Sequence, residues 1–83
     1  MITPLILILI SMLKLKYNFE HKTYSNFTYD ILQIKKGEPY QFFAKDKLVG
    51  AIEKINGKWE QTSGRQTLDE IVEGIGALIE QNT

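Results

Sequence analysis

The chain has no cysteine and a single histidine, His21, among its 83 residues. Without cysteine it has neither a disulfide framework nor a thiolate zinc site. One histidine is too few for a histidine-rich metal site within one chain. Lysine plus arginine equals aspartate plus glutamate at 10 each, so the net charge gives no indication of nucleic acid as a partner. We therefore expect no metal and no cofactor.

Catalytic groups are also scarce in the sequence. Nucleophilic catalysis needs a nucleophile, a base within reach and a group that orients the base. His21 stands beside Lys22 at an expected strand end, and we interpret it as a surface residue. Asp30 and Asp46 are conceivable as an acid–base pair, but nothing in their spacing places them together. No phosphate loop, zinc spacing or calcium loop is present, so we predict that the chain is not an enzyme.

What is present indicates first a C-terminal helix over residues 67–82. Thr67 and Glu70 have the spacing of a capping box, in which each side chain satisfies a free backbone donor. Gly74 and Gly76 lie inside this helix at a cost of about 1 kcal/mol each relative to alanine. We interpret them as allowing a close approach to the sheet, and the alternative is a groove for a partner helix. The apolar positions that form one helical stripe are Leu68, Ile71, Val72, Ile75, Leu78 and Ile79.

Alternation of apolar and polar residues predicts strands before the helix. The first has lysines on its polar face, which suits the edge of a sheet. Asn56-Gly57 is the strongest hairpin signal, because both residues tolerate the left-handed conformation of a two-residue turn. Whether Ile52 and Trp59 share a face depends on the type of that turn. The second strand has apolar residues on both faces, so we expect it to be covered on both sides or bulged. The predicted strands are residues 13–21, 27–34, 40–44, 48–52 and 58–61.

The order of these elements predicts an α+β fold. We expect a four- to five-stranded antiparallel meander followed by one C-terminal amphipathic helix packed on one sheet face. Strands that precede a single helix do not form a doubly wound parallel sheet, which needs alternating strands and helices. Residues 12–83 are predicted to be one domain, with 43% hydrophobic and 24% charged residues over the whole chain, as is usual for folded proteins.

Residues 1–11 form an apolar N-terminal extension, with an uninterrupted run of leucine and isoleucine over residues 5–10. A transmembrane helix needs about 20 apolar residues, and this run is far shorter. A signal peptide needs a basic residue before its apolar core and a small-residue cleavage site after it, and both are missing. The interpretation we favour is that Met12 is the true start and residues 1–11 are not native to the domain. We predict a cytoplasmic protein, with export or a membrane anchor left open.

Two sets of residues are candidates for binding. Ser63, Gly64 and Arg65 precede the helix, where backbone donors and the only arginine would suit an anion. The other interpretation, which we favour, is a loop whose glycine allows a sharp turn. The candidates for an interaction face are the aromatic residues Tyr17, Tyr29, Tyr40, Phe42 and Trp59. Core packing also explains aromatic residues in so small a domain, and we favour it.

The predicted function is protein–protein interaction. A small domain with few catalytic groups and one covered sheet face is expected to bind another protein or a second copy of itself through the open face. It would act as a regulatory partner or as a subunit of an assembly. One alternative is single-stranded nucleic-acid binding, in which bases stack on aromatic residues that are flanked by lysines. The lysines in question are Lys14, Lys16, Lys35 and Lys36. A further alternative, a secreted or membrane-tethered domain, depends on residues 1–13.

Overall fold

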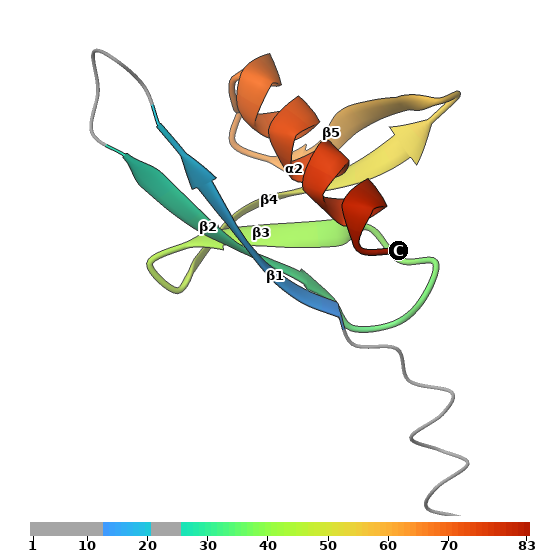
Figure 1. Cartoon of the computed structure of the whole chain (residues 1–83), viewed down its shortest axis with the longest axis horizontal. Coiled ribbons are helices and arrows are strands. Elements are labelled where there is room, and N and C mark those ends of the chain that lie inside the picture. Colours follow the sequence, from blue (N-terminus) through green and yellow to red (C-terminus); the bar gives the residue numbers. More distant parts are fainter. Residues whose placement is uncertain (1–12, 21–25) are drawn as a thin grey trace, which may run out of the picture.

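Every pair of neighbouring strands in the sheet is consecutive in the sequence and antiparallel (Figure 1). The structure is a computed structural model that describes residues 13–20 and 26–83. The sheet has the order β1-β2-β3-β4-β5, and the helix follows the last strand. The predicted α+β meander with a C-terminal helix is confirmed. The elements are β1 Leu13–Phe19, β2 Phe27–Gln33, β3 Tyr40–Ala44, β4 Lys47–Ile55, β5 Lys58–Gly64 and α2 Asp69–Gln81.

Two tight turns fix the register of the central hairpins. Lys45 and Asp46 have φ angles of 50° and 67°, and Asn56 and Gly57 have φ angles of 53° and 80°. Positive φ at both central residues matches the right-handed twist of the flanking strands. The hairpin predicted at Asn56-Gly57 is therefore confirmed. Its register pairs Lys54 with Trp59 and Ile52 with Gln61, so Ile52 and Trp59 lie on the same face.

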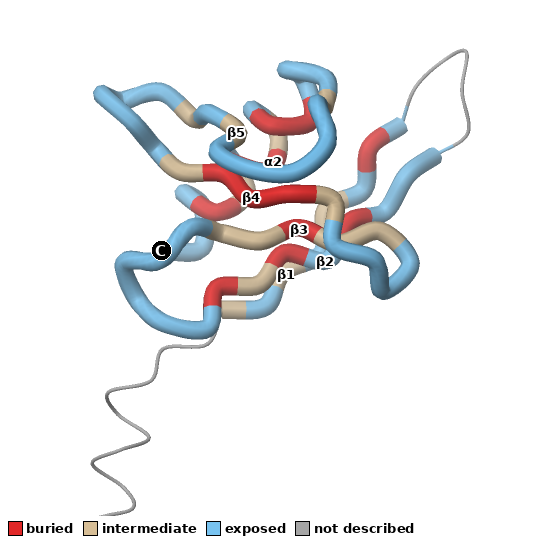
Figure 2. The backbone as a smooth tube through the Cα atoms, turned by 180° about the vertical axis from the view of Figure 1, so that it is seen from behind, coloured by how far each residue is buried: buried red, intermediate tan, exposed pale blue. Residues whose placement is uncertain are grey.

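The core lies between α2 and one face of the sheet. The helix packs against β1, β4 and β5. Figure 2 shows the buried segments running through the middle strands of the sheet and along α2, while the hairpin ends are exposed. The least exposed side chains come from β2, β3, β4 and the helix, so the apolar stripe of α2 covers the middle of the sheet. They are Phe42, Ile52 and Ile75 at 0% exposure and Ile31 and Ile79 at 1%.

The start of α2 differs from the predicted capping box. The helix begins at Asp69, and its N-cap residue, Leu68, makes no side-chain capping hydrogen bond. Thr67 is held by other partners. Its N–H donates to Oε1 of Gln61 on β5 at 3.0 Å, and its hydroxyl donates to the carbonyl of Arg65 at 3.0 Å. Thr67 therefore bonds to Gln61 of the sheet and to Arg65, and it does not cap the helix. The prediction of a Thr67–Glu70 capping box is wrong.

Gly74 and Gly76 lie where the helix approaches the sheet most closely. A Cβ atom at Gly76 would lie 2.3 Å from ring atoms of Trp59, and one at Gly74 would lie 2.0 Å from the hydroxyl of Tyr17. Real Cβ atoms essentially never come so close to a neighbour. The interpretation of these glycines as close-approach residues is confirmed, and they do not form a groove for a partner helix.

Strand β2 was expected to be covered on both faces or bulged, and it is neither. Its register with β1 is continuous, and Ile31 is buried beneath the helix, whereas Leu32 is only half-buried and Ile34, just beyond the strand, is 48% exposed. The irregularities lie instead between β3 and β4, where Val49 is the extra residue, and between β4 and β5.

Within the described residues no helix is both long and apolar enough to cross a membrane. The expectations for residues 1–11, Met12 and His21 lie outside the described residues.

Candidate interaction surface

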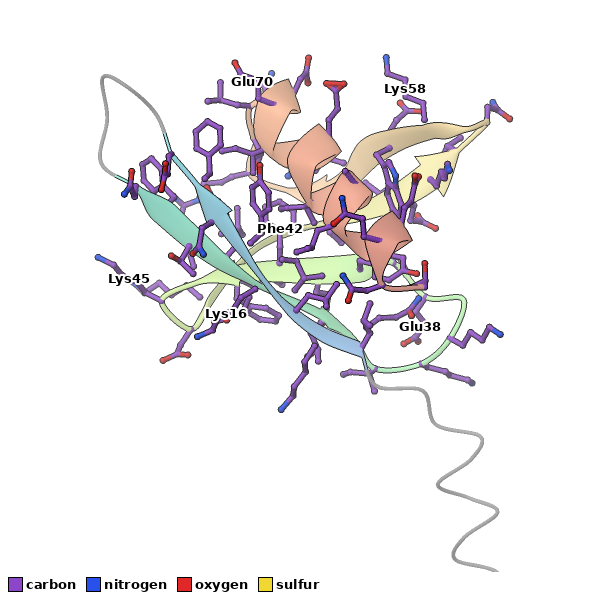
Figure 3. All side chains as sticks on the ribbon, in the orientation of Figure 1. Lys16, Glu38, Phe42, Lys45, Lys58 and Glu70 are labelled. Carbon is purple, nitrogen blue, oxygen red and sulfur yellow. The ribbon has the colours of Figure 1, made fainter. Side chains whose placement is uncertain are left out.

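The side of the sheet opposite α2 carries no second layer among the described residues (Figure 1). We call this side the open face. Because side chains alternate along a strand, the open face takes the residues between those of the core. Figure 3 shows the difference: Phe42 lies between the sheet and the helix, and Lys16 points away on the other side. The main residues of the open face are Lys14, Lys16, Asp30, Leu32, Gln41, Phe43, Ala51, Glu53 and Glu60.

An apolar hollow lies in the half of the open face formed by β1, β2 and β3. It has a volume of about 570 Å³, and Leu32 and Phe43 contribute its apolar side chains. Ile34, at 48% exposure, continues the apolar surface beyond the end of β2. An apolar centre with a charged rim is the usual composition of a protein–protein contact surface. The charged residues that line the hollow are Lys14, Lys16, Asp30 and Asp46.

The hollow brings together two carboxylates that sequence spacing did not connect. Asp30 lies on β2 and Asp46 in the turn after β3, and both line the hollow. The antiparallel pairing of β2 with β3 brings them to this end of the sheet. The carboxylate of Asp30 lies 3.9 Å from the ammonium of Lys16, so it forms an exposed ion pair. This arrangement gives the rim of the hollow charges of both signs.

The opposite end of the open face is acidic. Glu53 on β4 and Glu60 on β5 are direct cross-strand partners. Like charges in this position repel each other and destabilise the strand pair. Within residues 13–20 and 26–83, neither carboxylate has an ion-pair or hydrogen-bond partner. The open face therefore carries Lys14 and Lys16 on its first strand, and the glutamate pair together with Lys58 on its last two strands, where the net charge is negative.

The aromatic candidates for the interaction face lie on the other side of the sheet. They share the alternation of the core residues, so they point toward α2. The rings of Tyr29 and Phe42 make an edge-to-face contact at 5.8 Å, and those of Tyr40 and Trp59 make one at 5.7 Å. The interaction-face candidates Tyr17, Tyr29, Tyr40, Phe42 and Trp59 all belong to the core cluster or pack against it, which agrees with the favoured interpretation of core packing.

Phe43 is the aromatic residue that the sequence reasoning missed. It follows Phe42 directly, so strand alternation puts one ring in the core and the other on the open face. Among the described residues it is the only aromatic on the open face. Its signal was in the sequence, because two adjacent residues of one strand cannot share a face. Among the described residues, the open face therefore offers one aromatic ring.

Ser63 and Gly64 end β5, and Arg65 follows the strand. Gly64 has a φ of 93°, and a Cβ atom there would lie 2.1 Å from the carbonyl oxygen of Val49. The N–H of Arg65 donates to that same carbonyl at 3.0 Å. The amide of Gln61 donates to the carbonyls of Ser63 and Arg65. The N–H of Arg65 is therefore used within the turn, and the anion site at these three residues stays a prediction.

One ionic cluster joins the end of the helix to the sheet on the covered side. Oε2 of Glu80 accepts hydrogen bonds from Nζ of Lys54 at 2.7 Å and from Nε1 of Trp59 at 2.8 Å. These two donors lower the pKa of Glu80, with Lys54 the larger cause. The cluster positions α2 across β4 and β5. Within the described residues no three His, Cys, Asp or Glu side chains gather closely enough to hold a metal ion.

A second apolar groove lies beside the start of α2. It has a volume of about 590 Å³ and is lined by Phe27, Val49, Leu68 and Ile71 among others. Phe27 and Leu68 are 44% and 56% exposed. The groove lies between the start of α2 at Asp69 and the start of β2 at Phe27, which the helix leaves exposed.

Comparison of the chain with protein-family models, with curated proteins and with solved structures finds no match. The fold and the surface of the chain are therefore the basis on which its function is assigned.

Proposed function

We propose that this chain is a non-enzymatic binding module that contacts another protein molecule through its open face. The observation that carries this proposal is the difference between the two faces of the sheet. One face is covered by the chain's own helix. The other exposes Leu32 and Phe43 in its hollow, Ile34 beyond the end of β2, and charged side chains around the hollow. Contiguous apolar surface of this kind marks interaction sites on soluble proteins.

The energetic basis is the burial of apolar surface. Each square ångström of apolar surface that a partner removes from water contributes about 25 cal/mol. The side chains of Leu32 and Phe43 are only half-buried by the chain itself, so part of this contribution is still to be gained. Charged side chains at the rim keep the face hydrated when no partner is bound, and they select the partner's orientation by their sign.

The ionisable groups with shifted pKa values support a binding role over a catalytic one. Burial raises the pKa of the Tyr29 hydroxyl, and Lys54 with Trp59 lowers the pKa of Glu80. Both groups lie on the covered side, and each shift has a structural cause. Catalytic sites usually gather shifted groups in one cleft. Neither of these two residues lines the hollow on the open face.

Site-specific cross-linking tests the proposal. A photoreactive phenylalanine analogue is placed at Phe43, and at Gln81 as a control on the exposed end of α2. The variants are irradiated in cells that express the chain naturally. We expect position 43 to give protein adducts well above position 81. No excess of protein adducts at position 43 overturns the proposal, and adducts with nucleic acid there instead support base stacking.

A further inference from the structure

We infer that the partner is a second copy of this chain, docked open face to open face about a two-fold axis that runs parallel to the strands. This inference rests on the proposed function and names the partner for the same surface. It follows from the arrangement of charge on the open face. Each copy has the unpaired cation of Lys14 at one edge, and a net negative charge from Glu53, Glu60 and Lys58 at the other, so a second copy supplies the complement of both.

The cation is Lys14 on the edge strand β1. Lys16 lies two residues further along the same strand and is paired with Asp30 at 3.9 Å. Within the described part of the chain, Lys14 has no such partner. The carboxylates are those of Glu53 and Glu60, which repel each other across β4 and β5. A cation placed over the two glutamates relieves this repulsion.

The order of the strands determines how two open faces bring these groups together. With the two-fold axis along β3, the central strand, β1 of one copy lies over β5 of the other. Lys14 belongs to the cross-strand row that contains Leu32, Gln41 and Ala51, and Glu53 is the next open-face residue after Ala51. The offset along the strand is therefore two residues, roughly 7 Å. A lysine and a glutamate side chain together span that offset, and the contact forms twice per dimer.

The other two-fold arrangement brings like charges together. With the axis in the plane of the sheet but across the strands, β1 lies over β1 of the second copy and β5 lies over β5. Lysines then face lysines and glutamates face glutamates. Like-charge juxtaposition excludes wrong orientations in protein interfaces. The charges therefore select the axis parallel to the strands.

The apolar centre fits the same axis. Phe43 lies on β3, so the two Phe43 rings lie on either side of the axis and close to each other. The partner's β4 lies over β2, where Leu32 lines the hollow. Two sheets packed in this way lie about 10 Å apart with their strands nearly aligned, as in β-sandwiches.

A charge-swap experiment on the full chain tests the dimer. Sedimentation equilibrium over a range of protein concentrations is measured for the wild type, Lys14→Glu, Glu60→Lys and the double variant. We expect the wild type to dimerise and each single variant to raise the dissociation constant roughly tenfold or more, because two contacts become repulsive. The double variant restores the pairs with reversed sign and is expected to return toward the wild-type value. Lys36→Glu, which changes charge in the turn after β2 and away from the open face, is expected to leave dimerisation unchanged.

A loss of dimer through misfolding is separable from a loss of contact. Glu60→Lys places a lysine opposite Glu53, so we expect the folded monomer to be more stable than the wild type, as measured by urea unfolding at low protein concentration. A wild-type chain that stays at the monomer mass of 9.6 kDa at all concentrations overturns the inference. A double variant that dissociates as readily as the singles overturns it as well. Adducts of position 43 with a different protein, together with a monomeric chain, contradict the second copy and leave the proposed function intact.

Discussion

Replacing Gly76 with alanine tests the close contact between the helix and the sheet. A Cβ atom at this position would lie 2.3 Å from two ring atoms of Trp59, whereas ordinary contacts of a Cβ atom lie between 3.4 and 4 Å. The ring and the helix must therefore separate by about 1 Å. Trp59 is held in place, because its ring makes an edge-to-face contact with Tyr40 at a centroid distance of 5.7 Å and its Nε1 donates to Glu80 at 2.8 Å.

Two opposing effects decide the magnitude. Alanine is favoured over glycine inside a helix by about 1 kcal/mol. Overpacking a tight contact costs about 1–3 kcal/mol, and the central ring atoms of a held tryptophan place this site at the upper end of that range. We therefore expect Gly76→Ala to destabilise the fold by about 2 kcal/mol in spite of the gain in helix propensity. For a domain of this size the melting temperature falls by roughly 4 °C or more for each kcal/mol.

The assay is urea unfolding followed by circular dichroism and by Trp59 fluorescence. Ala77→Gly is the control for helix propensity, because Ala77 lies on the exposed side of α2, and it is expected to cost about 1 kcal/mol. Gly74→Ala is the matched variant. Its Cβ atom would meet the hydroxyl end of Tyr17, which is half-buried and can turn aside, so we expect a smaller loss than at Gly76.

A Gly76→Ala protein that is more stable than the wild type, with unchanged Trp59 emission, refutes this reasoning. It would mean that the helix lies further from β5 than the structure places it. A greater loss at Gly74 than at Gly76 would also contradict it, because the ranking depends on which neighbour can move.

Three further predictions concern the core, the turn after β5 and the helix end. Phe42→Ala removes a ring with 0% exposure and is expected to cost about 3–5 kcal/mol, whereas Phe43→Ala on the open face costs less than about 1 kcal/mol; urea unfolding at low protein concentration compares them. Gly64→Ala places a Cβ atom at a residue with a φ of 93° and against a backbone carbonyl, so we expect the free energy of unfolding to fall by about 1–3 kcal/mol. Because we favour a turn over an anion site at residues 63–65, we expect calorimetry to show the same phosphate binding as in the wild type. Glu80 has a lowered pKa in the folded state, so its stabilising effect is full above its ordinary pKa of 4.5 and is lost as the pH falls through and below that value. Glu80→Gln is expected to lower stability at pH 7 and to differ less from the wild type in acid, which thermal unfolding across pH measures.

Much of the architecture is predictable from local patterns. The alternation in β1, the Asn56-Gly57 turn and the apolar stripe of α2 each depend on residues close together in the sequence, and these patterns agree with the structure. The order of strands and helix then leaves a meander with one covered face. Gly76 was also interpretable, because glycine inside a strong helical pattern indicates close packing.

The details that failed depend on contacts between distant residues. Thr67 was predicted to cap the helix, but Gln61 binds its N–H from β5, and no local pattern shows that competition. Asp30 and Asp46 share a hollow because β2 and β3 pair, a fact that their spacing does not contain. To predict which face of the sheet each aromatic side chain lies on, one must know which alternate residues of every strand point toward the helix. Once Phe42 is assigned to the core, Phe43 follows on the open face.

Alkylation of a single cysteine on the open face tests the central claim most directly. The chain has no cysteine of its own, so Gln41→Cys on the central strand gives one reporter thiol, with Gln81→Cys on the exposed end of α2 as the control. We predict that Cys at position 41 reacts rapidly in dilute protein and slows as the concentration rises into the range of dimerisation, whereas the control reacts rapidly throughout. Slow reaction at position 41 in protein that sedimentation shows to be monomeric would show that the same chain covers this face, and would contradict the account.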